Sequence, residues 1–145
     1  MLYTEIKFCE NPSLLFNTTC ITPYYNPLAF PMYEQYCSIL GKQLIHIESQ
    51  EKLYALKAVM SIQTEMWIGI RGTGDSTSFQ NFFWKAKDSS AVYPIFTNWG
   101  DFQKLKSVSP QSGNCATIDS QTLLWTNRRC HSWYPFLCEQ GKHVQ

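Results

Sequence analysis

Trp67-Ile68-Gly69-Ile70 is the stretch that decides the fold of this chain. It is an uncharged apolar run, and it lies in the long cysteine-free middle between Cys37 and Cys115. A short run of this kind is typical of a buried strand. The cysteines stand in two clusters on either side of it: Cys9, Cys20 and Cys37 before it, and Cys115, Cys130 and Cys138 after it.

The six cysteines indicate where the protein works. An even set in a short chain is typical of a disulfide framework, and disulfides persist in oxidising compartments. We therefore expect an extracellular chain, either a secreted protein or the ectodomain of a membrane protein. Spacing alone leaves the pairing open. Asn17-Thr18-Thr19 is the one N-glycosylation sequon, which makes Asn17 the expected glycosylation site.

The composition is that of a folded protein. Apolar residues make up 44% and aromatic residues 15% of the 145 residues, so we expect a single domain over 1–145 with its core at about 9–139. Segments 1–8 and 140–145 flank that core. The net charge of +1 argues against nucleic acid as a partner, because such binding needs a strongly basic face. No apolar run approaches the ~20 residues of a membrane span. Residues 1–15 lack the basic and apolar regions of a signal peptide, so we expect a mature protein or an excised ectodomain.

The spacing of apolar residues predicts two helices in the first half of the chain. From Phe30 to Leu40, apolar side chains recur at helical spacing, and Gly41 follows as a stop signal. Ser49 is a suitable N-cap for a second helix that continues to about Met60.

Short strands and loops account for the rest. Pro23, Pro27 and Pro31 predict a loop after Cys20, and about 25 residues over 88–113 are mostly irregular. The expected strands are 1–8, 44–47, 67–70, 82–87, 115–119, 123–126 and 136–139. Two helices followed by many short strands predict an α+β fold.

Several further motifs follow the apolar run at characteristic spacing. They are Phe83-Trp84, Phe96-Thr97-Asn98-Trp99, Cys115-Ala116-Thr117-Ile118, Trp125-Thr126-Asn127, Cys130 and Phe136-Leu137-Cys138-Glu139. Together with the run itself, which is similar to a W-I-G-L core strand, these motifs resemble the C-type lectin-like domain in its long form. The resemblance covers about Cys9 to Glu139. It implies two helices, antiparallel sheets, a long disulfide-anchored loop, and the pairs Cys9–Cys20, Cys37–Cys138 and Cys115–Cys130.

The chain departs from this family where its sugar-binding members hold calcium. Their ligands are a Glu-Pro-Asn or Gln-Pro-Asp motif in the long loop and an Asn-Asp pair after the conserved Trp. Here Trp99 is followed by Gly100-Asp101-Phe102-Gln103-Lys104-Leu105-Lys106, and Trp125 by Thr126-Asn127. Calcium needs roughly six to eight oxygen ligands with sufficient negative charge. We therefore expect no metal and no cofactor, with calcium disfavoured.

The function that these observations favour is non-catalytic, calcium-independent extracellular recognition of a protein ligand through the long loop. The expected ligand contacts are Asp101, Phe102, Gln103, Lys104, Lys106, Thr126, Asn127, Arg128 and Arg129. Phe102 is preferred to Trp133 as an exposed aromatic contact. A lectin is the alternative, binding a sulfated or sialylated cell-surface glycan through basic residues or a sugar through an atypical calcium site. A homodimer also stays open.

An enzyme is not expected. Of the three histidines, His46 lies in an expected strand, His131 follows a cysteine and His143 is in the tail. No serine or cysteine shows the partner pattern of a nucleophile. Cys115, Cys130 and His131 could be imagined as zinc ligands, but an even disulfide set argues against it.

Overall fold

Two helices and a set of short strands form the described part of the chain. The computed structural model describes residues 3–4, 8–60, 63–72, 81–86, 88, 90–100, 114–141 and 143–144. The helices are α1 (Phe30–Ile39) and α2 (Gln50–Ala55), and the 3-10 turn η1 (Leu56–Ala58) extends α2. The strands are β1 (Tyr3–Thr4), β2 (Leu14–Phe16), β3 (Thr19–Leu28), β4 (Gln43–Leu44), β5 (Glu65–Gly72), β6 (Phe82–Lys85), β7 (Ala91–Val92), β8 (Cys115–Asp119), β9 (Trp125–Arg128), β10 (Tyr134–Gln140) and β11 (His143–Val144).

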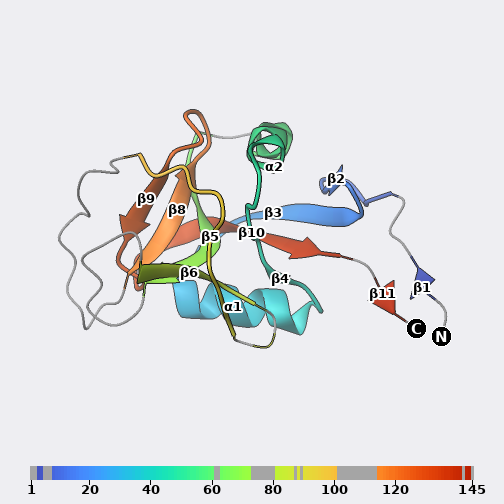
Figure 1. Ribbon diagram of the computed structural model, residues 1–145, viewed down its shortest axis with the longest axis horizontal. Helices are drawn as coiled ribbons and strands as arrows, with labels where there is room; N and C mark the ends of the chain where they lie inside the picture. Colours follow the sequence, from blue (N-terminus) through green and yellow to red (C-terminus); the bar gives the residue numbers. More distant parts are fainter. Residues whose placement is uncertain are drawn as a thin grey trace.

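One sheet connects most of these strands. Among the described residues its path is β2-β3-β10-β5-β6-β7, while β4 pairs with β10, and β8 pairs with both β5 and β9. β10 runs antiparallel to β3 and parallel to β5. α1 lies on one side of β3 and β10 and α2 on the other (Figure 1). β1 and β11 form a separate pair that brings the two chain ends together. The expected α+β class is confirmed.

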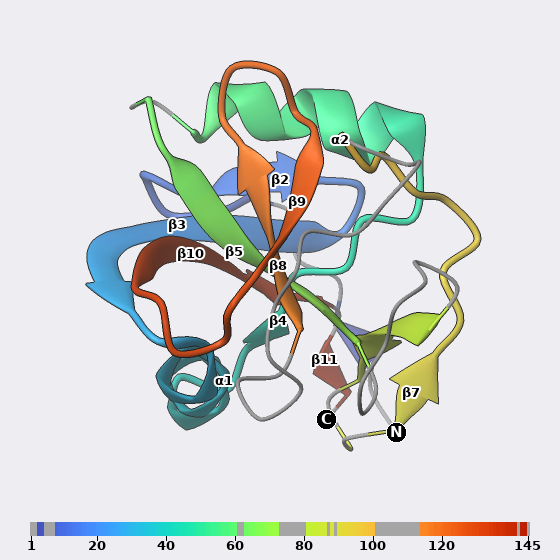
Figure 2. The ribbon, with the colours of Figure 1, turned by 90° about the vertical axis from the view of Figure 1, so that its left-hand side faces the viewer.

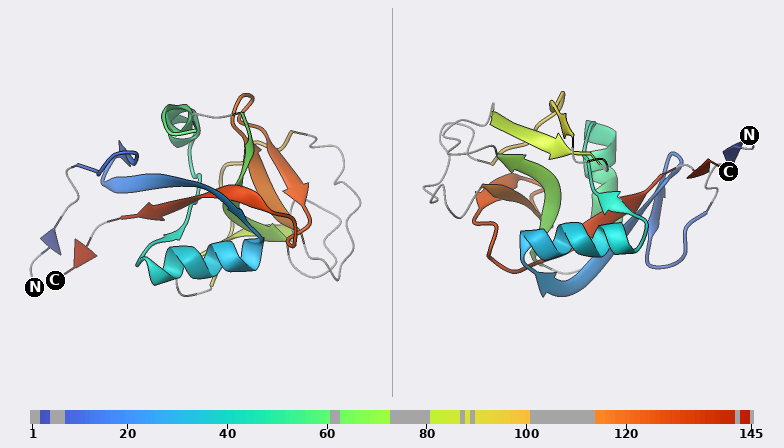
Figure 3. Two further views of the ribbon diagram at one scale, coloured as in Figure 1. Left: turned by 180° about the vertical axis from the view of Figure 1, so that it is seen from behind. Right: turned by 90° about the horizontal axis from the view of Figure 1, so that it is seen from below.

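The first helix forms where the sequence predicts it. Phe30, Tyr33 and Cys37 make its buried face, and Pro31 in the first turn suits a helix start. Gly41 follows the helix with φ 73°, a left-handed conformation that stops the helix and suits glycine. Figure 3 shows α1 lying along the strands when the molecule is seen from below.

The predicted loop after Cys20 is wrong, because this stretch is strand β3. β2 pairs only with Thr19–Ile21 of β3, so Pro23 and Pro27 lie beyond the part that β2 covers. Their missing N–H groups therefore cost no ladder bond to β2, which is the edge position where a sheet tolerates proline. Two other boundaries also differ. The strand expected at 44–47 is only Gln43–Leu44, and the one expected at 123–126 begins at Trp125.

The core lies on both faces of the sheet. Along β5, Met66 and Ile68 join the cluster that includes α2, whereas Trp67 joins the cluster on the α1 side. Gly69 is required by close packing, since a Cβ there would stand 2.7 Å from both the Ile45 carbonyl oxygen and the Leu44 Cβ. The apolar run that decides the fold is thus buried on both faces, as predicted.

Three disulfides cross-link segments that lie apart in the sequence. They are Cys9–Cys20, Cys37–Cys138 and Cys115–Cys130, the pairs that the resemblance implies. Cys37–Cys138 ties α1 to β10 across 101 residues of sequence, and Cys115–Cys130 joins β8 to the segment after β9. No helix in the described ranges is long and apolar enough to cross a membrane.

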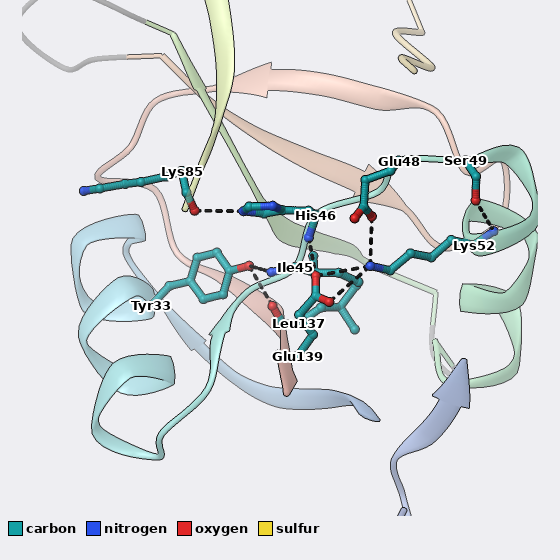
Figure 4. Close-up of polar contacts among 9 residues, drawn as sticks. All are labelled: Tyr33, Ile45, His46, Glu48, Ser49, Lys52, Lys85, Leu137 and Glu139. Atoms are coloured by element: carbon teal, nitrogen blue, oxygen red, sulfur yellow. Dashed lines mark hydrogen bonds and ion pairs between the residues drawn. The ribbon is translucent and has the colours of Figure 1, made fainter. Parts of the chain in front are cut away.

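A buried ion pair fastens α2 to the sheet. The Lys52 ammonium lies 3.1 Å from Glu139 Oε2, and both side chains are 6% exposed (Figure 4). Glu48 Oε1 is the ammonium's second acidic partner at 3.0 Å, and the His46 backbone N–H donates to Glu139 Oε1 at 2.6 Å. On the α1 side of the sheet, the Tyr33 hydroxyl donates to the Leu137 carbonyl at 2.7 Å. Burial raises the pKa of this hydroxyl well above its ordinary value.

Candidate binding surface

β8 and β9 form a hairpin that carries several of the residues expected to contact a ligand. Figure 2 shows these two strands facing the viewer in front of β5. Cys115 lies opposite Arg128, and Thr117 opposite Thr126. Leu123, in the connecting turn, has φ 64° and donates its N–H to the Asp119 carbonyl at 2.8 Å. Leu123 therefore belongs to the turn, and β9 begins only after it. The hairpin therefore fixes the direction of each β9 side chain.

Both ends of the long loop are hydrogen-bonded to the sheet, one end to β9 and the other to β5. The Gly100 N–H donates to the Trp125 carbonyl at 2.8 Å, and the Trp125 N–H donates to the Asn98 carbonyl at 2.9 Å. At the other end, the Gly72 N–H donates to the Asn114 carbonyl at 2.8 Å. The segment 101–113 itself, with the expected contacts Asp101, Phe102, Gln103, Lys104 and Lys106, lies outside the described residues.

The expected contacts on β9 point in two directions. Asn127 is 3% exposed and belongs to the core side of the strand, together with Trp125. Thr126 and Arg128 alternate with them and are half-buried on the other face. Arg129, the residue after the strand, is exposed. Of the four predicted contacts in this stretch, Arg129 is therefore the most accessible to a partner.

Arg128 is engaged within the protein. Its Nε donates to Glu65 Oε1 at 2.8 Å and its Nη2 donates to Glu65 Oε2 at 2.9 Å, a two-bond pairing of guanidinium and carboxylate. The hydrogen bond to Glu65 is the main reason that the pKa of Arg128 is raised. The Thr117 hydroxyl also donates to Glu65 Oε1. Arg128 thus contributes little free charge to a surface.

Arg71 shows the same behaviour on the other side of Cys115. The register places Arg71 of β5 and Arg128 of β9 on either side of Cys115. The Arg71 guanidinium lies 3.7 Å from a Glu34 carboxylate oxygen and 5.9 Å from the ring centre of Phe30. The two arginines thus flank the position of Cys115, and each one is paired with a carboxylate.

The connection Arg129–Trp133 between β9 and β10 presents exposed side chains on a buried anchor, Cys130. Trp133 is 66% exposed, and Arg129 and His131 are exposed beside it. Cys130 anchors the connection twice, by its disulfide to Cys115 and by its carbonyl, which accepts the Phe30 N–H at 2.9 Å. The sequence analysis preferred Phe102, which lies outside the described residues, and did not single out Trp133. The available signal was its position between Cys130 and the last strand, where a short connection exposes side chains.

The described residues around β9 do not supply the donor set that calcium needs. The Asn-Asp pair of the calcium-binding pattern is replaced by Thr126, which has only a hydroxyl, and Asn127, which is buried. Asp119 Oδ1 accepts the N–H groups of Gln121 at 2.8 Å and Thr122 at 2.9 Å, and these bonds lower the pKa of Asp119. Within the described ranges no three His, Cys, Asp or Glu side chains gather in a metal-binding group.

A cavity of about 570 Å³ lies elsewhere, between α1, β4 and the end of β6. Its charged lining residues have internal partners. Lys85 is paired with Glu34, and Lys42 donates to the Tyr24 hydroxyl at 2.7 Å. The hydroxyl partner of Lys42 is neutral and leaves its charge in place, but none of the residues expected to contact a ligand lines this cavity, so the β9 side remains the better candidate.

Comparison with known proteins identifies the family. The family model "Lectin C-type domain" matches residues 26–140. The human secretory phospholipase A2 receptor is 31% identical over 114 residues, covering 76% of this chain and 7% of the receptor. The chain therefore spans only a small part of the length of that relative.

Solved structures show the same fold. The human scavenger receptor C-type lectin carbohydrate-recognition domain superposes with a TM-score of 0.72 at 19% identity, covering 92% of this chain and 99% of that one. Human lithostathine superposes with a TM-score of 0.75 at 17% identity, covering 94% and 92%. C-type lectin domains bind protein or glycan ligands, are generally non-catalytic, and occur in secreted proteins and receptor ectodomains. By its sequence match and its fold, this chain belongs to the C-type lectin domain family.

Proposed function

We propose that this chain is a non-catalytic extracellular recognition domain that binds a protein ligand without calcium. The contact surface is the connection Arg129–Trp133 together with the long-loop segment 101–106 predicted from the sequence. One observation carries the proposal: Trp133 is 66% exposed on a connection that a disulfide and a backbone hydrogen bond hold in place.

The composition of this connection favours a protein partner. Trp and Arg are the residue types that contribute most to protein–protein binding energy, and a preorganised connection loses little entropy when it binds. The relative named secretory phospholipase A2 receptor supports the same class, because its name specifies a protein ligand. The three disulfides fit an extracellular setting.

Calcium independence rests on the residues that replace the family's ligands. A hydroxyl at Thr126 and a buried amide at Asn127 leave this half of the site without a carboxylate. The measurement is a melting temperature with calcium and with chelator. We expect equal values, since a ligand that binds only the native state must raise the melting temperature. A rise of several degrees that chelator reverses would refute calcium independence.

The ligand class is tested on cells with the whole chain, biotinylated and assembled into tetramers. Binding to a protein ligand is expected to disappear after protease treatment of the cells and to survive glycosidases and chelator. A purified secretory phospholipase A2 serves as one defined probe, chosen for the relative's name. Binding that glycosidase removes and protease leaves would replace the protein ligand by a glycan.

The surface is tested by two variants of similar chemistry. Trp133→Ala is expected to weaken binding by about 2 kcal/mol, roughly thirtyfold in Kd, as for an aromatic hot spot. Tyr54→Ala is the matched control, because Tyr54 is an aromatic residue that is 58% exposed and belongs to α2, an element apart from the β9–β10 connection. Equal binding by both variants would remove the connection from the contact surface.

A second candidate is an acidic glycan, favoured by the exposed Arg129 and His131. Binding driven by these charges would fall steeply between low and physiological salt, whereas an aromatic-centred protein contact would change little. A glycan array run with calcium and with chelator separates this candidate from an atypical calcium site. The sequence analysis left a homodimer open, and the molecular mass measured by size-exclusion chromatography tests it.

A further inference from the structure

We propose that Asn17 carries an N-linked glycan, and that this glycan covers the β2–β3 end of the molecule while leaving the β9–β10 side open. The first half of this proposal rests on the sequon Asn17-Thr18-Thr19 and on the hairpin that presents it. The second half rests on the proposed function, because it assumes that the ligand binds near Trp133.

Asn17 lies at the tip of a tight hairpin. Phe16 pairs with Thr19 across the turn, so Asn17 and Thr18 are its two connecting residues. The Asn17 side chain is exposed. An exposed turn between two short strands presents the amide to an enzyme in the secretory pathway, where sequons become modified.

The geometry of the turn accounts for Asn17 but not for the hydroxyl of Thr19. Asn17 has φ 54°, and asparagine tolerates this left-handed conformation better than most residues. The hairpin geometry therefore favours Asn or Gly at this position, with or without a glycan. It makes no demand for a hydroxyl two residues later, and Thr19 supplies that hydroxyl. Asn11 offers an internal comparison: it is exposed and Ser13 follows two residues later, but Pro12 between them excludes modification.

The reaction is a glycosyl transfer whose donor is a lipid diphosphate-linked oligosaccharide. The side-chain nitrogen Nδ2 of Asn17 bonds to the anomeric carbon of the first sugar. The bond from that carbon to the diphosphate oxygen breaks, the lipid diphosphate leaves, and Nδ2 gives up one proton. No residue is oxidised or reduced.

The hairpin and the candidate surface lie at different ends of the molecule. In Figure 1, β2 lies on the right, in the half of the picture that also holds the two chain ends, and β9 lies on the left. Figure 3 shows the same separation from behind. A bulky, hydrated glycan at the hairpin tip would block contacts there, including any to Leu15, which is 38% exposed. It would not cover Trp133.

The experiment uses the whole chain, secreted from a eukaryotic host, with mass measured before and after peptide-N-glycosidase. Four proteins are compared: wild type, Asn17→Gly, Thr19→Val and Thr19→Ser. Asn17→Gly keeps the left-handed turn and removes the acceptor nitrogen. Thr19→Val keeps a β-branched residue in β3 and removes the hydroxyl, whereas Thr19→Ser keeps the sequon.

We expect wild type and Thr19→Ser to lose mass, and Asn17 to become Asp at the cleaved site. Asn17→Gly and Thr19→Val should show no mass change. A secreted, disulfide-bonded wild type without a glycan at Asn17 would overturn the proposal. For the second half, Asn17→Gly and wild type should bind the ligand with the same Kd. A change of tenfold or more would overturn the placement of the glycan away from the ligand without affecting the glycosylation result.

Discussion

Arg128 of β9 and Glu65 of β5 are joined by two parallel hydrogen bonds, Nε to Oε1 at 2.8 Å and Nη2 to Oε2 at 2.9 Å. The two side chains are only 27% and 26% exposed, so solvent screens the pair incompletely. β8 lies between the two strands, and the pair bridges it. Arg128, which the sequence suggested as a ligand contact, thus also links β9 to β5 within the protein.

Removing this link should lower stability. We expect Arg128→Ala to reduce the free energy of unfolding by about 1–3 kcal/mol, because the half-buried Glu65 carboxylate loses two charge-assisted bonds. Urea denaturation measures the change. Arg129→Ala is the control, since Arg129 is exposed and should change stability by less than about 0.5 kcal/mol. Equal stability of the two variants would contradict the structural role of Arg128.

The ion pair of Lys52 with Glu139 should show strong coupling. Lys52→Met leaves the Glu139 carboxylate buried and unpaired, which costs about 3–5 kcal/mol in comparable cases. The double variant Lys52→Met/Glu139→Leu removes both charges, and we expect it to be more stable than Lys52→Met alone. A double-mutant cycle by chemical denaturation gives the coupling energy. Additive losses would show that the two charges do not depend on each other.

Gly69 is expected to resist substitution. Any Cβ there would approach the Ile45 carbonyl oxygen and the Leu44 Cβ to 2.7 Å, so β5 or β4 would have to move. Gly69→Ala should cost about 1–3 kcal/mol, as overpacking does in other cores. At Gly141 the nearest atom to a Cβ is Thr19 Oγ1 at 3.8 Å, which is ordinary contact. Gly141→Ala is thus a control. The melting temperatures of both variants are compared with that of the wild type, and only Gly69→Ala should lower it.

The sequence predicted the buried parts of this fold better than its edges. The strand at Trp67–Ile70 and the helix from Phe30 follow from apolar spacing, because burial imposes that spacing. Strand β3 was missed because its prolines lie on an edge that sequence spacing does not reveal. The candidate site was harder to predict than the fold. Whether Arg128 is free depends on its pairing with Glu65, which lies more than sixty residues earlier in the chain. The placement of Trp133 depends on the disulfide of Cys130, which holds the connection between β9 and β10.

The stability that Asp119 contributes through the β8–β9 turn should depend on pH. The backbone N–H groups of Thr122 and Gln121 donate to its carboxylate and hold its pKa below the ordinary value of 3.8. The charged form is therefore favoured in the folded protein, and the stabilisation is present above pH 3.8 and lost as the pH falls through the lowered pKa. We expect wild type to be more stable than Asp119→Asn near neutral pH, and this difference to shrink with acid. A difference that stays constant down to the lowest pH would contradict this assignment.

The Cys115–Cys130 disulfide should matter less for folding than Cys37–Cys138 does, and it should also affect binding. It closes 15 residues of sequence, for which the chain-entropy model gives about 3 kcal/mol, whereas Cys37–Cys138 closes 101 residues and gives about 4.7 kcal/mol. Replacing Cys115 and Cys130 together by alanine should therefore destabilise the protein less than replacing Cys37 and Cys138. The same double replacement frees the connection that carries Trp133, so ligand binding should weaken even where the variant is fully folded. Urea titration followed by binding at a temperature well below the melting point separates the two effects. Undiminished binding by a folded variant would mean that the disulfide does not organise the contact surface.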